Sequence, residues 1–126
     1  MIITIKALDA TSAEHMIRQI APLDYQKVDG GGLNRAGYGV EYFRGGNIGL
    51  AKIYERHQLT QVSVFSESSN ATVNICTTFN SICGEPTIAE TDSLTASQIA
   101  EICAALNQPA VFAQKGKKSN GYSTIR

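Results

Sequence analysis

Residues 38–67 contain the feature that most constrains the fold, namely three short stretches of β-forming residues joined by tight turns. The stretch 38–43 is rich in aromatic residues, 48–55 follows the turn sequence Arg-Gly-Gly-Asn, and 61–67 alternates between apolar and polar residues. Paired glycines accept positive φ and are typical of hairpin turns. Strict alternation is typical of a strand with one buried face. These residues therefore predict an antiparallel meander of three strands.

Two amphipathic segments with capping boxes lie on either side of this meander. Thr11 and Glu14 mark the start of a helix at 12–21, and Thr95 and Gln98 mark a helix at 96–107. In each segment the apolar residues recur at helical spacing; they are Ala13, Met16, Ile17 and Ile20, then Ile99, Ile102, Cys103 and Leu106. Each helix thus presents one apolar stripe, which we expect to lie on a sheet.

Residues 69–83 fit two structures. Four apolar or small side chains fall on one helical stripe, whereas five residues restrict χ1 in a way that opposes a helix; the first set is Thr72, Cys76, Phe79 and Cys83, and the second is Thr72, Val73, Ile75, Thr77 and Thr78. Judged on the stripe, a helix is favoured. Strands are expected at 2–8 and, more briefly, at 86–91.

The order of these elements predicts an α+β fold. An antiparallel sheet, with β-α-β-β-β order in the first half, packs against about three helices. The 126 residues suit a single domain, which we place at 1–114. Residues 115–126 are polar and basic, and we expect a mobile tail there.

The N-terminus and the cysteines indicate a cytoplasmic protein. The first eight residues, MIITIKAL, lack the basic and small-residue regions of a signal peptide. No apolar run is long enough to span a membrane. The three cysteines are too few and too irregularly spaced for a secreted disulfide scaffold. We therefore expect reduced cysteines that pack as small hydrophobes.

The charges are unevenly distributed, although the formal net charge is zero. Residues 1–56 sum to +1, residues 57–114 to −5 and residues 115–126 to +4. The middle segment contains no Lys or Arg, and its acids are a candidate surface for a protein partner; they are Glu67, Glu85, Glu90, Asp92 and Glu101.

A second candidate surface is the meander, where aromatic and basic side chains interleave. Such sheets can stack single-stranded bases or hold an anionic ligand. The candidate contacts for a ligand or nucleic acid are Arg35, Tyr42, Arg44, Lys52, Tyr54, Arg56 and His57. The glycine-rich run 30–37 could cradle an anion, but it lacks the lysine and hydroxyl of a phosphate-binding loop. It is better interpreted as a flexible loop between strands.

The sequence contains no pattern typical of an active site. His15 and His57 are the only histidines, and neither has the neighbouring ligands of a metal site. We predict no catalytic residue, no metal and no cofactor, and we lean against an enzyme.

The favoured function is therefore a small non-catalytic interaction protein, a regulator or inhibitor that binds another macromolecule. The first alternative is a nucleic-acid-binding module that uses the aromatic and basic sheet face together with the tail. The second is a small enzyme or anionic-ligand-binding domain that uses the loop 30–37. An exposed strand edge would also allow a homodimer.

Overall fold

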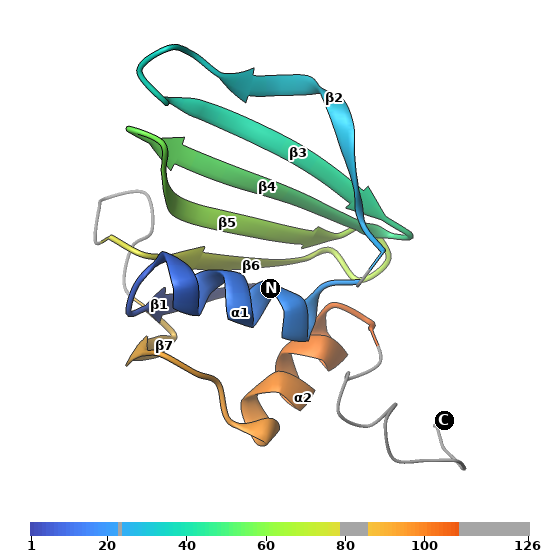
Figure 1. Cartoon of the computed structure of the whole chain (residues 1–126). Coiled ribbons are helices and arrows are strands. Elements are labelled where there is room, and N and C mark those ends of the chain that lie inside the picture. The colour runs from blue at the N-terminus through green and yellow to red at the C-terminus, as the bar shows by residue number, and fades with distance from the viewer. Residues whose placement is uncertain (23, 79–85, 109–126) are drawn as a thin grey trace.

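The computed structural model describes residues 1–22, 24–78 and 86–108, which form one mixed sheet and two helices (Figure 1). The seven strands follow the order β2-β3-β4-β5-β6-β1-β7. The elements are β1 (Ile2–Ala7), α1 (Ala10–Ile20), β2 (Gln26–Leu33), β3 (Gly39–Gly45), β4 (Ile48–Glu55), β5 (Gln58–Ser66), β6 (Ala71–Cys76), β7 (Ile88–Thr91) and α2 (Ala96–Ala105). The predicted α+β class is confirmed.

The predicted meander is confirmed as β3, β4 and β5, which pair antiparallel in chain order. Alternation decides which side of the sheet each residue occupies. Val62 and Val64 are fully buried beneath the helices, whereas Phe65 on the opposite face is 39% exposed. The strand at 86–91 is also confirmed, as β7.

The first half of the glycine-rich run 30–37 belongs to strand β2, where the sequence predicted a loop, whereas residues 34–37 do lie between two strands, β2 and β3. β2 pairs with β3, and its register shifts between Val28 and Gly32. The two backbones approach so closely that a Cβ at Gly31 would lie 2.3 Å from the carbonyl oxygen of Val40. Glycine is therefore needed here for close approach of strands, a role that the sequence alone does not separate from loop flexibility.

Strands β2 and β7 form the two edges of the sheet. The shifted register of β2 and the four-residue length of β7 are features that blunt an edge against pairing with another chain. A homodimer built through a sheet edge remains a prediction.

The favoured helix at 69–83 is wrong for its first half. Residues 71–76 form β6, which lies between β5 and β1. Its residues Val73 and Ile75 are fully buried under the helices, so β-branching and period-two burial outweighed the helical stripe. Residues 79–83 of the predicted helix lie outside the described residues. Two helices rather than three thus occur in the described part of the chain. The sheet is mixed rather than antiparallel, because β1 runs parallel to both β6 and β7.

Both predicted amphipathic helices form, but the first begins earlier than expected. The N-cap of α1 is Asp9, whose carboxylate accepts a hydrogen bond of 2.8 Å from the Ser12 backbone amide. Hydrogen bonds from the backbone and side chain of Ser12 lower the pKa of Asp9. The predicted capping box at Thr11 is therefore wrong, whereas the box of Thr95 and Gln98 caps α2 as predicted.

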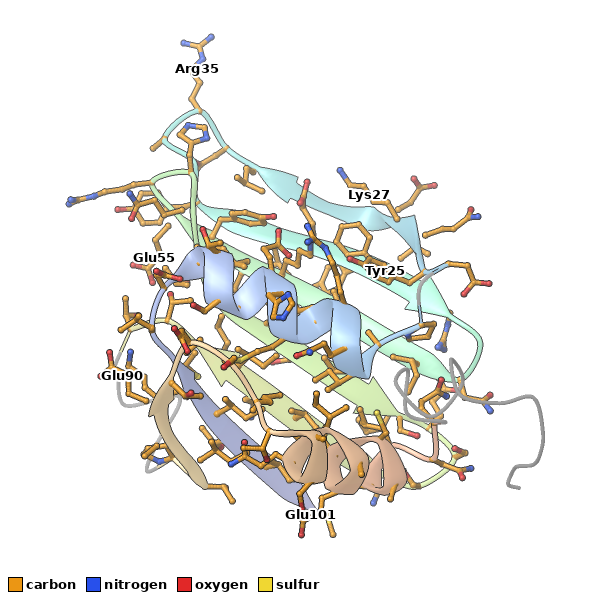
Figure 2. The ribbon with its side chains drawn as sticks, turned by 60° about the horizontal axis from the view of Figure 1, so that its bottom comes forward. Tyr25, Lys27, Arg35, Glu55, Glu90 and Glu101 are labelled. Carbon is orange, nitrogen blue, oxygen red and sulfur yellow. The ribbon has the colours of Figure 1, made fainter. Side chains whose placement is uncertain are left out.

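The helices lie side by side on one face of the sheet and bury one apolar core (Figures 1 and 2). Their buried residues meet those of β1, β5 and β6, while β2 and β3 extend beyond α1 and have neither of the two described helices over them (Figure 1). Neither α1 nor α2 has the length and apolarity that a bilayer crossing requires. The opposite face of the sheet carries no described helix.

The cysteines differ from one another. Cys103 is a free thiol in the core, as expected for a small hydrophobe. Cys76 is disulfide-bonded, so the expectation that the cysteines are reduced is wrong for this residue. Disulfides are typical of oxidising compartments. The Cys76 disulfide thus gives no support to a cytoplasmic location, which stays a prediction. The expected tail at 115–126 lies outside the described residues.

The assignment of residues 71–76 as a buried strand can be tested with a matched pair of substitutions. Ile75→Ala removes a fully buried side chain and should destabilise the fold by about 3 kcal/mol. Ile2→Ala makes the same change at a site that is 69% exposed, and it should cost less than about 0.5 kcal/mol. Denaturant unfolding measures both values, and similar costs would contradict the assignment.

Candidate functional site

The open face of the sheet, opposite the helices, is organised in rows that cross the strands. Strand pairing places each residue beside one partner on either side. One row contains Val28, Tyr42, Ala51, Ser63 and Asn74, and the next contains Gln26, Arg44, Gly49, Phe65 and Thr72. The two rows thus place small residues on β4 between larger ones on β3 and β5.

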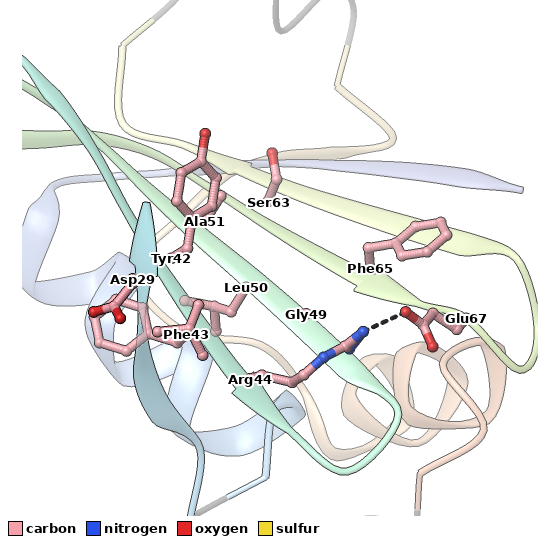
Figure 3. Close-up of a pocket in the computed structure, with 11 residues that line it drawn as sticks. Asp29, Tyr42, Phe43, Arg44, Gly49, Leu50, Ala51, Ser63, Phe65 and Glu67 are labelled. Atoms are coloured by element: carbon pink, nitrogen blue, oxygen red, sulfur yellow. Dashed lines mark hydrogen bonds and ion pairs between the residues drawn. The ribbon is translucent and has the colours of Figure 1, made fainter. Parts of the chain in front are cut away.

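These rows form a groove of about 520 Å³ on the open face (Figure 3). Tyr42 and Phe65 stand on its two sides and are 41% and 39% exposed. Gly49 and Ala51 lie between them on β4 and form its floor (Figure 3). We refer to this feature as the groove; its other charged or polar members are Asp29, Arg44, Ser63 and Glu67.

A chain of side-chain hydrogen bonds adjoins the groove floor. The Ser63 hydroxyl donates to Asn74 Oδ1 at 2.7 Å and accepts from Gln61 Nε2 at 3.1 Å. Because Ser63 is engaged on both sides, it offers little hydrogen-bonding capacity to a ligand. The floor is therefore polar at one margin and apolar in the middle.

An exposed ion pair closes one end of the groove. Arg44 Nη2 donates to Glu67 Oε2, and the two side chains are 47% and 56% exposed (Figure 3). An exposed pair of this kind contributes little to stability. Arg44 and Glu67, proposed from the sequence for different partners, thus belong to one surface.

Lys52 and Tyr54, grouped with Tyr42 in the sequence analysis, lie on the helix side of β4. Lys52 Nζ is 3.0 Å from Glu14 Oε1 of α1 and 5.2 Å from the ring centroid of Phe43. The Tyr25 ring meets Phe43 edge-on at 5.3 Å. This cluster joins α1 to the neighbouring part of the sheet, which extends beyond the helix.

Tyr54 extends the same cluster. Burial and the neighbouring Glu41 carboxylate raise the pKa of Tyr54 to about 12. The hydrogen bond from Lys27 lowers the pKa of Glu41. These contacts hold Tyr54 as a neutral phenol within the fold, so it is not available as an exposed stacking platform.

The remaining basic candidates meet at the tips of two hairpins. We define the hairpin tips as residues 34–38, between β2 and β3, and residues 56–57, between β4 and β5. The His57 amide donates to the Gly37 carbonyl at 3.0 Å, and Arg56 Nε donates to the Tyr38 hydroxyl at 3.2 Å. Arg35 extends from the same end of the molecule (Figure 2).

The backbone at the hairpin tips is unusual. Arg56 and His57 both have positive φ, at 53° and 65°, as a type I′ turn requires. A Cβ on Gly37 would lie 2.3 Å from the His57 amide nitrogen. Non-glycine residues in this conformation carry strain, and the contacts between the two tips offset it.

The acidic candidates do not form one surface. Glu67 belongs to the groove, Glu90 lies on the edge strand β7, and Glu101 projects from α2 (Figure 2). Asp92 is exposed just after β7, and Glu85 lies outside the described residues. The sequence run therefore disperses over several elements once the chain folds.

The titratable groups with shifted pKa values lie away from the groove. Burial raises the pKa of the Cys103 thiol to about 11, which disfavours the reactive thiolate. His15 is exposed on α1, and His57 lies at the hairpin tips. Among the described residues, no three His, Cys, Asp or Glu side chains gather as a metal site would need.

Phe65, Gly49 and Ala51 are groove residues that the sequence analysis did not select. Side chains that alternate along a strand put Phe65 on the same face of β5 as Ser63. That pattern was the available signal for its exposure, but the pairing of three strands is needed to place it beside Gly49.

Comparison of the chain with protein-family models, with curated proteins and with solved structures gives no match. Its function must therefore be inferred from the surface itself.

Lys52 and Arg44 differ in burial, so their removal should lower the free energy of unfolding by different amounts. Lys52→Ala removes a mostly buried ion pair and a cation–π contact, and it should destabilise the fold by about 2 kcal/mol. Arg44→Ala removes an exposed ion pair and should cost less than about 0.5 kcal/mol. Thermal and denaturant unfolding check the difference, and equal costs would show that Lys52 is not structural.

Proposed function

We propose that this chain is a non-catalytic interaction protein, a regulator or inhibitor, which binds another macromolecule through the open face of its sheet. The groove between Tyr42 and Phe65 is the observation that carries the proposal. We also propose that it acts in the cytoplasm, with the Cys76 disulfide as the feature that any test of location must explain.

The exposed apolar side chains support a binding role for this face. Three of the large hydrophobic residues with high exposure belong to its rows; they are Val28, Tyr42 and Phe65. Exposed Ile2 of β1 extends the second row, because it pairs with Thr72. An exposed apolar patch with a charged margin is typical of an interaction surface. Tyr and Phe are also enriched at protein interfaces.

The chemistry of the groove supports binding rather than catalysis. Its polar members are an ion pair, a carboxylate and a serine hydroxyl that is bonded to an amide. A nucleophilic serine needs a general base within hydrogen-bond reach. The partner of Ser63 is Asn74, which cannot take up its proton.

Affinity capture tests the proposal with groove variants. Tagged wild-type protein should retain a protein partner at near-physiological salt, and the partner should survive nuclease treatment. Tyr42→Ser with Phe65→Ser should abolish retention, because it removes both apolar walls of the groove. Circular dichroism and thermal unfolding should show that the double variant remains folded, since both side chains are over one-third exposed.

Charge reversal of the dispersed acids is the control. Glu90→Lys, Asp92→Lys and Glu101→Lys change exposed residues of β7, the following turn and α2, outside the groove. Retention should persist in this variant. Retention that is lost here and kept in the groove variant would move the site to these acidic residues of β7, the following turn and α2.

The hairpin tips favour a second candidate function, contact with a single-stranded nucleic acid. They bring Arg35, Arg56 and His57 to one end of the molecule, beside the 41% exposed ring of Tyr38. Cations that flank an aromatic ring are the usual elements of such contacts. The adjacent Glu55 offsets part of the positive charge, so this binding should be weak.

A salt titration tests this candidate. A fluorescently labelled single-stranded DNA should bind at about 20 mM salt and dissociate by about 150 mM, because few phosphate contacts are made. Arg35→Ala with Arg56→Ala should remove the binding seen by fluorescence anisotropy. Arg18→Ala with Lys27→Ala removes the same number of charges elsewhere and should leave it intact. Absence of binding at the lower salt would eliminate the candidate.

A further inference from the structure

Resting on the proposed function, we infer that the partner is a protein that inserts one large apolar side chain, flanked by a basic residue, into the groove. The inference concerns the kind of partner rather than the location of the surface. The backbone, the groove floor and the charges at its ends each support it.

The backbone of the groove admits side chains rather than an added strand. β3 pairs with β2 and β4, β4 with β3 and β5, and β5 with β4 and β6. The strands that carry the groove residues Tyr42, Gly49 and Phe65 are thus paired on both sides, and their ladders are closed to a further chain. Recognition in the groove therefore depends on side chains, unlike recognition at a sheet edge.

The groove floor has room for a large side chain. A Cβ placed on Gly49 would have no heavy atom within 4 Å apart from its chain neighbours, so the space above the floor is open. The volume of about 520 Å³ lies in the range of pockets that hold compact ligands. With Tyr42 and Phe65 as walls, the cavity matches an aromatic or long aliphatic anchor, which commonly dominates interface energetics.

The polar margin of the floor does not favour a polar occupant. Ser63 is hydrogen-bonded to both Gln61 and Asn74. A sugar or a base edge placed on this part of the floor would have to break these bonds or leave the polar groups that face Ser63 unpaired, which costs free energy in a partly dry site. Burial of an apolar side chain carries no such cost.

The charges at the groove ends favour a basic neighbour for that side chain. Arg44 is already paired with Glu67, and Asp29 adds a second carboxylate. One cation and two anions give the groove a formal charge of −1. Phosphate is repelled by such a surface, whereas a lysine or arginine beside the anchor finds an opposite charge.

Peptide selection tests this inference. A phage-displayed library of random dodecapeptides is selected against the immobilised full-length protein, and enriched peptides are measured by fluorescence anisotropy. The enriched sequences should share a Phe, Tyr, Trp or Leu next to Lys or Arg. Their amide shift perturbations in the labelled protein should centre on Gly49, Ala51 and Phe65.

Two variants and a matched control locate the binding. Gly49→Leu fills the groove floor and should weaken a selected peptide by at least about tenfold, since the anchor supplies most of the affinity. Ala100→Leu adds the same side chain at an exposed position of α2 and should change nothing. Asp29→Asn with Glu67→Gln should weaken basic-flanked peptides while retaining the apolar preference.

Three outcomes would overturn the inference: no enriched peptide, a consensus without an apolar anchor or with acidic flanks, or equal binding to wild type and Gly49→Leu. These outcomes differ from failure of the proposed function. If the double variant Tyr42→Ser with Phe65→Ser loses the captured partner but the peptide selection fails, the groove is the binding surface and the proposed apolar anchor is wrong. If the double variant still retains the partner, the surface itself is wrong.

Discussion

The two described helices are together narrower than the seven-stranded sheet on which they pack, and much of the structure follows from this difference in width. Seven strands at about 4.8 Å spacing extend for about 29 Å across the sheet. Two helices side by side, each about 10 Å wide, cover about 20 Å of one face. In the described part of the chain, one whole face and the β2–β3 end of the other therefore have no helix over them (Figure 1).

Strand β4 is where the protein resolves this shortage. On the helix side, Leu50 and Lys52 continue the core, and Lys52 joins Glu14 of α1 to the aromatic rings beyond the helix. On the other side, Gly49 and Ala51 leave space between larger neighbours. Alternate residues of one strand thus hold the fold together on one face and form the groove on the other.

Sequence periodicity predicted the elements that depend on local pattern. The meander and both amphipathic helices were found because period two and helical spacing are visible in single segments. The helix prediction for 69–83 is wrong at residues 71–76, because a chance helical stripe competed with β-branched residues and only the pairing of β6 with β1 and β5 decides between them. β2 was missed because its glycines serve close strand contact.

The candidate site was predictable only in part for the same reason. Tyr42 and Arg44 were both candidate binding residues in the sequence analysis, and both lie in the groove. Lys52 and Tyr54 were grouped with them, but they occupy the opposite face, because faces on neighbouring strands match only once the register is known. The groove floor is a product of register across three strands, which no single segment encodes.

The position of β1 has a consequence for how the chain is made. This first strand lies inside the sheet, where Ile2 pairs with Thr72 of β6 and Ile5 pairs with Ile88 of β7. During synthesis both edges of β1 remain open until its partners have left the ribosome. Such long-range parallel pairing is slow and exposes apolar strands in the meantime. Strand β1 is thus made before its partners β6 and β7, and it is secured in the sheet only after both have been synthesised.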